Sequence, residues 1–424
     1  MSFFEHLGGD RPDRAAPSRV YARVDGPSTR SADGYTRLDC LDAHWADEVG
    51  LGRGALCDPE LTEEVEQRVS MMLVRTHTTQ EDEGQLLELT LEEARAGEGT
   101  ALHYINLTGP PIPQDVTAMN SLSHGGARRI ADITDIDGLR PASPDDLERA
   151  VIRASDAVDA VAVYDVGQGS CSALLKDGAP TLYFDVGGGA LNNAATFPQG
   201  FDALCVTQSP TVVLSHWHYD HWSLAKRFDG QLLQSRWIVP RQGRPGFTAS
   251  VLLGLIRKHG EALLWPETLA QTRWGAVAIH RCNGRSRNDS GIALIVHGPN
   301  NMQVVLPGDA RYRYITALPR VTTSLVAAHH GGVTGAQESE IPRPDGERAG
   351  RLVYSCGDRN SYGHPMTASV VRHNHAWGQS SQLRTSDREQ GRDHQHVHLY
   401  WDHNQPVSQL GCGGKMCSLE PCRR

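Results

Sequence analysis

Short apolar runs that end in polar residues recur in the second half of the chain. Residues 212–214, 304–306 and 325–328 are such runs, and a histidine or aspartate follows each of them within three residues. Runs this short predict buried strands rather than helices. Because layered α/β enzymes carry their functional residues where strands end, the pattern predicts an α/β fold with a site at these strand ends.

The first 150 residues have a different pattern. Residues 1–55 are rich in Gly, Pro, Asp and Arg with weak periodicity, which predicts partial disorder. "CDPELTEEVEQRVSMMLV", with Asp58 as N-cap, and "QLLELTLEEARAGEG" predict two helices, and "SPDDLERAVIRA" predicts another. We therefore expect three parts, which are an acidic, partly helical N-terminal extension (1–150), a catalytic domain (155–405) and a Cys-containing tail (406–424).

Four metal-capable side chains follow the first apolar run within six positions. They are His216, His218, Asp220 and His221. If the strand continues, His216 and His218 face one point, because side chains alternate along a strand. Asp220 and His221 come after a local turn and can face a second point. Imidazole and carboxylate ligands suit Zn²⁺ and also admit Mn²⁺ or Fe²⁺. The pattern predicts two adjacent divalent ions, with Zn²⁺ or Mn²⁺ as the leading candidates.

A site with two ions needs further ligands, and the other two strand ends supply them. Asp309 follows the second run, and His329 and His330 follow the third. We expect Asp309 to bridge the ions and the histidine pair to provide a ligand, with the choice between His329 and His330 left open. Two ions would lower the pKa of a shared water, and Asp220 would serve both as ligand and as catalytic residue.

These motifs resemble those of a known family. "HWHYDH" (216–221) is similar to the HxHxDH signature of the metallo-β-lactamase fold, and "GDA" (308–310) and the histidine pair resemble its later ligand motifs. Four further segments are similar, in the same order, to the soluble ComEC-like domain of competence DNA-uptake proteins. They are "VYDVGQGSCSALL" (163–175), "LYFDVGGG" (182–189), "NDSGIALIV" (288–296) and "SCGDRNSYGHP" (355–365). The resemblance implies a four-layer αββα sandwich and a metal-dependent hydrolase.

The resemblance also implies roles for single residues. Asp185 and Asn288 would orient metal ligands, and Asp165 and Gln168 would support catalysis. His364 would reach the substrate or the reacting water, although a surface-loop histidine is the alternative.

One ligand of the family is missing from its usual place. Many relatives have an extra histidine between the first cluster and the bridging aspartate. Here His280 and His297 lie in that interval but in no recognisable motif. We therefore expect one ion to have fewer protein ligands.

The net charge of −9 conceals an asymmetry. Residues 1–150 hold 14 Lys and Arg against 28 Asp and Glu, whereas the remainder holds 27 against 22. Arg285, Arg287 and Arg311 lie beside the motifs, and arginine matches phosphate oxygens, although a solvated surface is the alternative. This favours a phosphate-containing substrate, with DNA or RNA as one class, and a protein partner for the acidic extension.

Three functions stay open at this point. The leading hypothesis is a phosphodiesterase or nuclease. The second is a hydrolase of small esters, lactones or thioesters, and the third is a non-catalytic, partner-binding protein that retains a metal site.

The sequence also leads to expectations about cellular location and about the C-terminal tail. Neither a run of about 18 apolar residues nor a secretory signal is evident, which favours a cytoplasmic protein without membrane contact. Near the C-terminus, His394, His396 and His398 alternate along an expected strand. Cys412, Cys417 and Cys422 belong either to a flexible tail with free thiols or to a structural zinc site.

Overall fold

The computed structural model describes most of the chain. The described residues are 16–25, 34–75, 83–94, 99–156, 158–228, 230–335, 337–346, 350–387 and 396–401. The predictions for Cys412, Cys417 and Cys422 and for His394 lie outside these residues.

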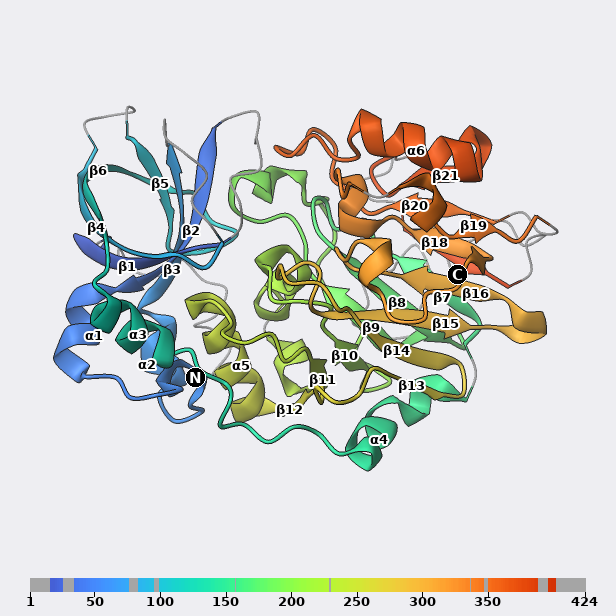
Figure 1. Cartoon of the computed structure of the whole chain (residues 1–424), viewed down its shortest axis with the longest axis horizontal. Coiled ribbons are helices and arrows are strands. Elements are labelled where there is room, and N and C mark those ends of the chain that lie inside the picture. The colour runs from blue at the N-terminus through green and yellow to red at the C-terminus, as the bar shows by residue number, and fades with distance from the viewer. Residues whose placement is uncertain are drawn as a thin grey trace. The chain divides into compact units, whose positions relative to one another are not determined.

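The chain divides into two compact units (Figure 1). The first unit comprises Met1–Arg140 and Gln242–Gly260, and the second comprises Pro141–Arg241 and Glu261–Arg424. Residues 242–260 therefore belong to the first unit, although the segments that flank them in sequence belong to the second.

The first unit contains a closed β-barrel with the strand order β1-β2-β3-β5-β6-β4. Its strands are β1 (Arg19–Val24), β2 (Tyr35–Asp42), β3 (Val69–Arg75), β4 (Leu86–Glu93), β5 (Ala101–Tyr104) and β6 (Ile112–Ser121). Its helices are α1 (Ala43–Val49), α2 (Thr62–Glu66), α3 (His124–Asp132), α5 (Phe247–His259) and the 3₁₀ turn η2 (Ala55–Cys57).

Alternating apolar residues build the barrel. Leu87, Leu89 and Leu91 of β4 are buried in the barrel core, and the residues between them are not. A period of two is the pattern of a half-buried strand, because successive side chains point to opposite faces. The helix predicted over this segment is therefore wrong.

The other helix predicted in this region is also wrong for most of its length. Only Thr62–Glu66 is helical, and Val69–Arg75 forms a strand that is buried except at its last residue. Strand pairing on both sides with β2 and β5 outweighs the local helix signals of Asp58 and Pro59.

A carboxylate of the barrel caps helix α5. Gly246 stands at the N-cap of α5 and has no side chain to accept a hydrogen bond. Asp39 of β2, which is buried, takes this role, and the Thr248 N–H donates to its Oδ1 at 3.1 Å. A Cβ at position 246 would lie 2.0 Å from Asp39 Oδ2, so a larger residue there would displace the capping carboxylate.

The second unit contains two seven-stranded sheets. The first sheet has the order β12 (Glu261–Leu264), β11 (Arg236–Val239), β10 (Thr211–Val213), β9 (Ala179–Val186), β8 (Cys171–Lys176), β7 (Ala160–Val163) and β22 (Val397–Tyr400). The second has the order β13 (Gln271–Trp274), β14 (Val277–Arg281), β15 (Ile292–His297), β16 (Gln303–Leu306), β18 (Ser324–Val326), β20 (Leu352–Tyr354) and β21 (Gln382–Arg384).

Smaller elements complete this unit. Strands β17 (Val321–Thr322) and β19 (Arg343–Pro344) pair with each other. The α-helices are α4 (Pro144–Ser155) and α6 (Thr367–Trp377). The 3₁₀ turns are η3 (Leu191–Thr196), η4 (Tyr219–His221), η5 (Ser223–Lys226), η6 (Gln231–Gln234), η7 (Pro299–Asn301), η8 (Tyr312–Tyr314), η9 (Ala328–Gly331), η10 (Glu338–Glu340) and η11 (Gln379–Ser381).

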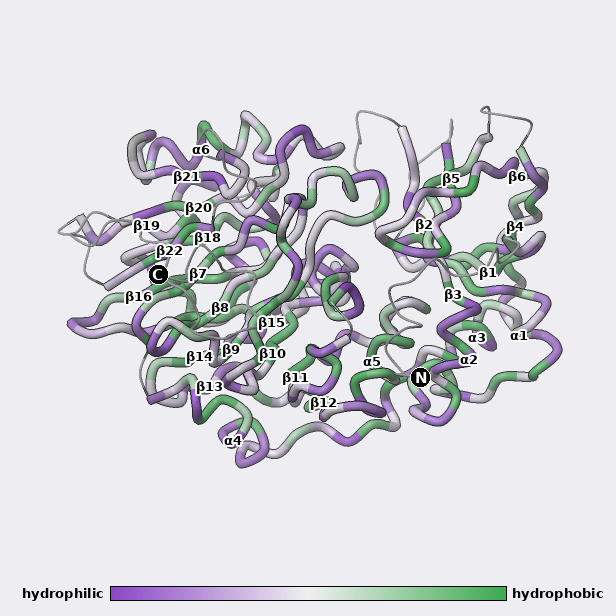
Figure 2. The backbone as a smooth tube through the Cα atoms, turned by 180° about the vertical axis from the view of Figure 1, so that it is seen from behind, coloured by the Kyte–Doolittle hydropathy of each residue, from purple (hydrophilic) through white to green (hydrophobic). Residues whose placement is uncertain are grey.

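The two sheets share one hydrophobic core, and hydrophobic residues follow their strands (Figure 2). Phe184 and Val213 of the first sheet belong to the same buried cluster as Leu294 and Leu306 of the second. On the other face of the second sheet, Trp377 of α6 belongs to a separate cluster. The predicted mixed α/β fold is confirmed, whereas helix layers on both outer faces stay a prediction.

Several local predictions are confirmed. The three apolar runs form β10, β16 and β18. The helix predicted from "SPDDLERAVIRA" is α4, which begins with a capping box between Ser143 and Asp146. None of the described helices combines the length and apolarity that a bilayer span requires.

We predict that Asp39→Ala destabilises the first unit by about 1–2 kcal/mol, because the substitution removes the cap of α5. Urea unfolding followed by circular dichroism would show a lower midpoint. Glu48→Ala, at an exposed position of α1, is the control and should leave the midpoint unchanged. Equal midpoints for the two variants would contradict the capping role of Asp39.

Candidate metal centre

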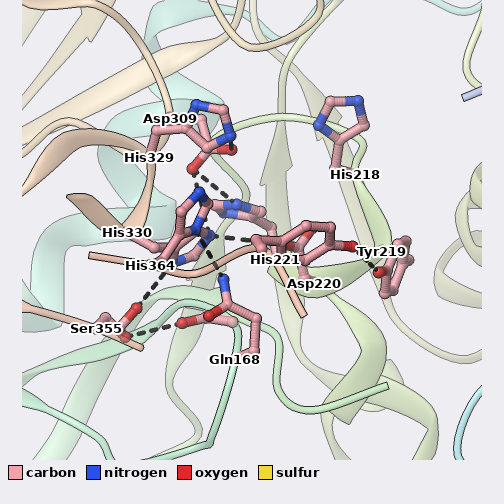
Figure 3. Close-up of polar contacts among 12 residues, drawn as sticks. Gln168, His218, Tyr219, Asp220, His221, Asp309, His329, His330, Ser355 and His364 are labelled. Carbon is pink, nitrogen blue, oxygen red and sulfur yellow. Dashed lines mark hydrogen bonds and ion pairs between the residues drawn. The ribbon is translucent and has the colours of Figure 1, made fainter. Parts of the chain in front are cut away.

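Parallel strands bring the predicted ligands together. In the first sheet β9 and β10 are parallel, and in the second sheet β16, β18 and β20 are parallel. The carboxyl ends of parallel neighbours lie at the same edge of a sheet, so the residues that follow them converge. Figure 3 shows side chains from both sheets gathered at this point.

The first ligand group contains His216, His218 and Asp309. One ligand atom from each lies within 4.8 Å of those of the other two, and all three residues are buried. His216 Nε2 and His218 Nδ1 are 3.0 Å apart. The two histidines face one point as predicted, but they do so from the loop after β10, because the strand ends at Val213. The alternation argument that led to this prediction was therefore wrong.

The second ligand group contains Asp220, His221 and His330. Asp220 and His221 lie in η4, and His330 lies in η9 after β18. His330 Nε2 is 3.5 Å from Asp220 Oδ2. A tight 3₁₀ turn thus brings two neighbouring residues toward a histidine from the other sheet.

The carboxylate of Asp309 stands between these groups. Its Oδ1 lies 3.1 Å from His221 Nε2 and 3.5 Å from His330 Nε2. Its Oδ2 lies 3.6 Å from His216 Nε2, on the side of the first group. One carboxylate oxygen therefore faces each group, which is the arrangement of a bridging ligand.

His329 and His330 point to different oxygens of this carboxylate. His329 Nε2 lies 3.6 Å from Asp309 Oδ2, whereas His330 faces Oδ1. Both residues have left-handed backbone conformations, with φ of 54° and 55°. Such a conformation costs about 1–2 kcal/mol for each residue, and here it turns adjacent side chains toward two places. Of the pair, His330 lies in a ligand group, and His329 adjoins the first group through Asp309.

The donor set fits divalent cations. His221 Nε2, His330 Nε2 and Asp309 Oδ1 are buried and have no hydrogen-bond partner within the described chain. Ligand atoms about 2.1 Å from an ion in tetrahedral geometry are about 3.4 Å apart, which is close to the separations of 3.1–3.6 Å around Asp309. A buried carboxylate and unpaired imidazoles are costly unless a cation satisfies them, so these residues can hold two ions.

Hydrogen bonds fix the orientation of two of the imidazoles. His221 Nδ1 donates to Asp185 Oδ2 at 2.7 Å, and His330 Nδ1 donates to the Ser355 carbonyl at 2.9 Å. These bonds leave Nε2 of each ring with its lone pair toward Asp309. Asp185 is itself held by the Ser215 N–H at 2.7 Å and the Ser215 hydroxyl at 2.9 Å. Ser215 and Ser355 were not predicted from the sequence, since neither is a metal ligand.

The carboxylates of the site favour their charged forms. Burial opposes ionisation of Asp220, but the contact with His330 and the charges of His221 and His330 outweigh it and lower its pKa. Burial likewise opposes ionisation of Asp309, and the surrounding histidines hold its pKa well below its usual value. Burial and the neighbouring His221 lower the pKa of His216. Ionised carboxylates and a neutral imidazole are the forms that bind metals.

Protons compete with an ion at the other histidines. Burial disfavours the charged form of His221, but Asp309 and Asp185 outweigh it and raise its pKa. The pKa of His330 is raised in the same way by Asp309 and Asp220. Metal affinity should therefore increase with pH.

His364 lies beside the histidine pair. Its ring centroid is 5.4 Å from that of His329 and 6.0 Å from that of His330. Gln168 Nε2 lies 3.3 Å from His364 Nδ1, and because an amide nitrogen only donates, this contact leaves the ring hydrogen on Nε2. Burial, together with His329 and His330, lowers the pKa of His364. The structure thus places the predicted His364 and Gln168 side by side, and their catalytic roles stay predictions.

Asn360 holds the loop that carries His364. Its Oδ1 accepts from the His364 N–H at 2.9 Å and the Tyr362 N–H at 3.2 Å. Its Nδ2 donates to the carbonyls of His364 at 2.6 Å and Gly357 at 2.9 Å. The Tyr362 hydroxyl also bonds that of Tyr219 at 2.8 Å. Asn360 was not predicted from the sequence, although it lies inside the segment "SCGDRNSYGHP" (355–365).

Asp165 is buried, and its carboxylate accepts a hydrogen bond from the turn that follows it. Its backbone N–H donates to His396 Nδ1 at 3.0 Å, and its Oδ1 accepts from the Gly167 N–H at 3.4 Å. Its predicted catalytic role stays a prediction.

The residues predicted to orient ligands or bind substrate lie in the loops after β14 and β16. Arg311 is paired with Asp289 and lies over the ring of Tyr314, 4.8 Å from its centroid. Arg285 is exposed, Arg287 is buried, and Asn288 Oδ1 is buried without a hydrogen-bond partner among described residues. The charge of Arg311 is therefore largely engaged, and the roles of all four residues stay predictions.

Comparisons with known proteins add little. No protein-family model and no curated protein matches the chain. Among solved structures, the chain is similar to CmlA, a diiron beta-hydroxylase from Streptomyces venezuelae, with 13% identity, 79% of this chain and 70% of that chain covered, and a TM-score of 0.33. It is also similar to MEM-A1, a subclass B3 metallo-beta-lactamase isolated from a soil metagenome library, with 14% identity, coverages of 52% and 94%, and a TM-score of 0.25. Likenesses this low establish no activity for this chain.

We predict that Asp185→Asn weakens the binding of one metal ion by about 10–100-fold. The amide would present a donor to His221 Nδ1, which would move the ring proton to Nε2 and remove the ligand lone pair. Competition with a chelating dye measures the affinity. Asp202→Asn, at an exposed position, is the control, and equal affinities for the two variants would show that Asp185 does not orient His221.

Proposed function

We propose that this chain is a metal-dependent hydrolase of the metallo-β-lactamase type, with two divalent ions, Zn²⁺ or Mn²⁺, at its centre. The observation that carries the proposal is the position of Asp309, whose two oxygens face two groups of buried ligands. His216, His218 and Asp309 would hold one ion, with His329 beside them. Asp220, His221, His330 and Asp309 would hold the other.

Two bound ions would supply a hydroxide at neutral pH and stabilise developing negative charge. Side chains of the protein would supply the remaining contributions to catalysis. His364 is neutral, carries its hydrogen on Nε2 and lies beside the ligands, so it can donate a hydrogen bond to a substrate oxygen on which negative charge develops. Gln168 fixes the ring hydrogen, and Asn360 fixes the loop.

The substrate class that we favour is a phosphodiester, with DNA or RNA as candidates. The excess of basic over acidic residues after position 150 supports an anionic substrate. Arg285 is exposed beside the motif of residues 288–296 and can contact phosphate oxygens. The ComEC-like motifs support this choice of substrate. The proposal also includes a complete four-layer sandwich, a cytoplasmic location and a protein partner for the acidic region.

A second candidate is the hydrolysis of uncharged esters, lactones or thioesters. The ion pair between Arg311 and Asp289 favours it, because the pair removes one of the three arginines that a phosphate would use. A non-catalytic role is less favoured, since the ligand groups and the supporting hydrogen bonds of Asp185 and Ser355 are all present.

We predict that Mn²⁺-loaded protein cleaves a phosphodiester, and that His364→Ala lowers kcat by about 10²–10³-fold with metal content unchanged, because the developing negative charge loses a hydrogen-bond donor. Turnover of bis-nitrophenyl phosphate, cyclic nucleotides and oligonucleotides would be compared with that of nitrophenyl acetate, lactones and thioesters. His375→Ala is the matched control, since His375 is exposed and pairs with Glu338.

Two outcomes would change the proposal. Cleavage of esters or lactones with every phosphodiester untouched would favour the second candidate. Full activity of His364→Ala would remove His364 from the mechanism even if the metal centre is correct.

A further inference from the structure

The first unit contains a cavity that the proposed hydrolase site does not use. Its volume is about 880 Å³, within the range of small-ligand sites. Its lining comes from β1, the residues before and in β4, helix α3 and the segment that leads into α5. All of these residues belong to the first unit.

One face of helix α3 forms part of the cavity wall. His124, Ala127, Arg128 and Ala131 line the cavity, and their spacing of three and four residues places them on one side of the helix. Two of these four residues, Ala127 and Ala131, are alanines, whose side chains fill little volume. The apolar side chains of Leu86, Ile130 and Phe247 complete the wall.

The polar part of the lining is basic. Arg23, Arg128, Arg244 and His124 contribute to it, and Asp137 is the one acidic residue among the described residues that line the cavity. The Arg23 Nη1 donates to the Arg244 carbonyl at 2.6 Å, which holds the two segments together. This lining contrasts with residues 1–150 as a whole, where acidic residues outnumber basic ones by two to one.

The basic side chains of this lining differ in whether they already form ion pairs with acidic residues. Arg244 pairs with Asp132 at 3.1 Å. Asp137 in turn lies 3.9 Å from Arg53, outside the cavity lining. The exposed guanidinium of Arg128 has neither an ion pair nor a hydrogen bond to any residue that the structure describes. An anion in the cavity would therefore meet Arg128 without displacing an existing partner.

We propose that this cavity binds a small organic anion that has an apolar or aromatic body. The apolar wall would take the body, and Arg128, assisted by Arg23 and His124, would take the carboxylate, sulfonate or phosphate group. A long polyanion fits poorly, because the surrounding acidic residues would repel its remaining charges. The proposal does not depend on the hydrolase function, since the proposed metal ligands all belong to the second unit.

Paired fluorescent probes test the proposal on the full chain. Anilinonaphthalene sulfonate is an aromatic anion, and phenylnaphthylamine is its uncharged counterpart. We expect the anion to bind with one-site saturation and at least about fivefold more tightly than the neutral probe. Near-ultraviolet circular dichroism of the same samples would show that the protein is natively packed, so that the probe does not report a loosened core.

Two variants separate charge from volume. Arg128→Gln should weaken binding of the anion about two- to fivefold and leave the neutral probe unchanged. Ala131→Leu should weaken both probes, because it fills the cavity without changing the charge. Arg140→Gln is the matched control, since Arg140 is exposed in the same unit and lies outside the cavity lining.

Three results would overturn the proposal. They are the absence of saturable binding of the anion, equal affinities for the charged and neutral probes, and an Arg128→Gln variant that behaves like Arg140→Gln. The last comparison stays decisive if Ala131→Leu fails to fold, because Arg128 is a surface residue.

Discussion

The candidate metal centre depends on one buried carboxylate, that of Asp309. An ionised carboxylate in the interior is costly unless positive charge or hydrogen bonds compensate it, and four imidazoles stand within 3.6 Å of this one. The architecture makes this cluster possible because parallel strands of two sheets end at the same place. Gly291 shows how closely the segments must approach, since a Cβ there would lie 2.0 Å from the Ser215 carbonyl oxygen.

The orientation of the imidazole rings is a second constraint on the metal centre. A histidine binds a metal only through a nitrogen without hydrogen, so each ring needs a partner that holds its proton on the other nitrogen. Asp185 does this for His221, and the Ser355 carbonyl does it for His330. Gln168 applies the same principle to His364 but in the opposite sense, because it leaves the hydrogen on the nitrogen that can act as donor.

The strand-end residues could be predicted because the motif "HWHYDH" and the short apolar runs are local signals. The supporting groups could not, since Ser355 acts through a backbone carbonyl and Asn360 through a loop whose path the sequence does not show. The barrel was missed because "CDPELTEEVEQRV" carries local helix signals that strand pairing overrides. Membership of residues 242–260 in the first unit involves contacts between residues far apart in sequence, such as that of Thr248 with Asp39, which no local pattern reveals.

The central claim is that Asp309 joins two metal ions at one centre. Electron paramagnetic resonance of the Mn²⁺-loaded protein tests it most directly, because two Mn²⁺ ions that share a carboxylate bridge are magnetically coupled. The account predicts a coupled dinuclear spectrum at two equivalents of Mn²⁺, which Asp309→Ala converts to the signal of isolated ions. Isolated-ion signals at every loading of the unmodified protein, or no binding at all, would contradict it.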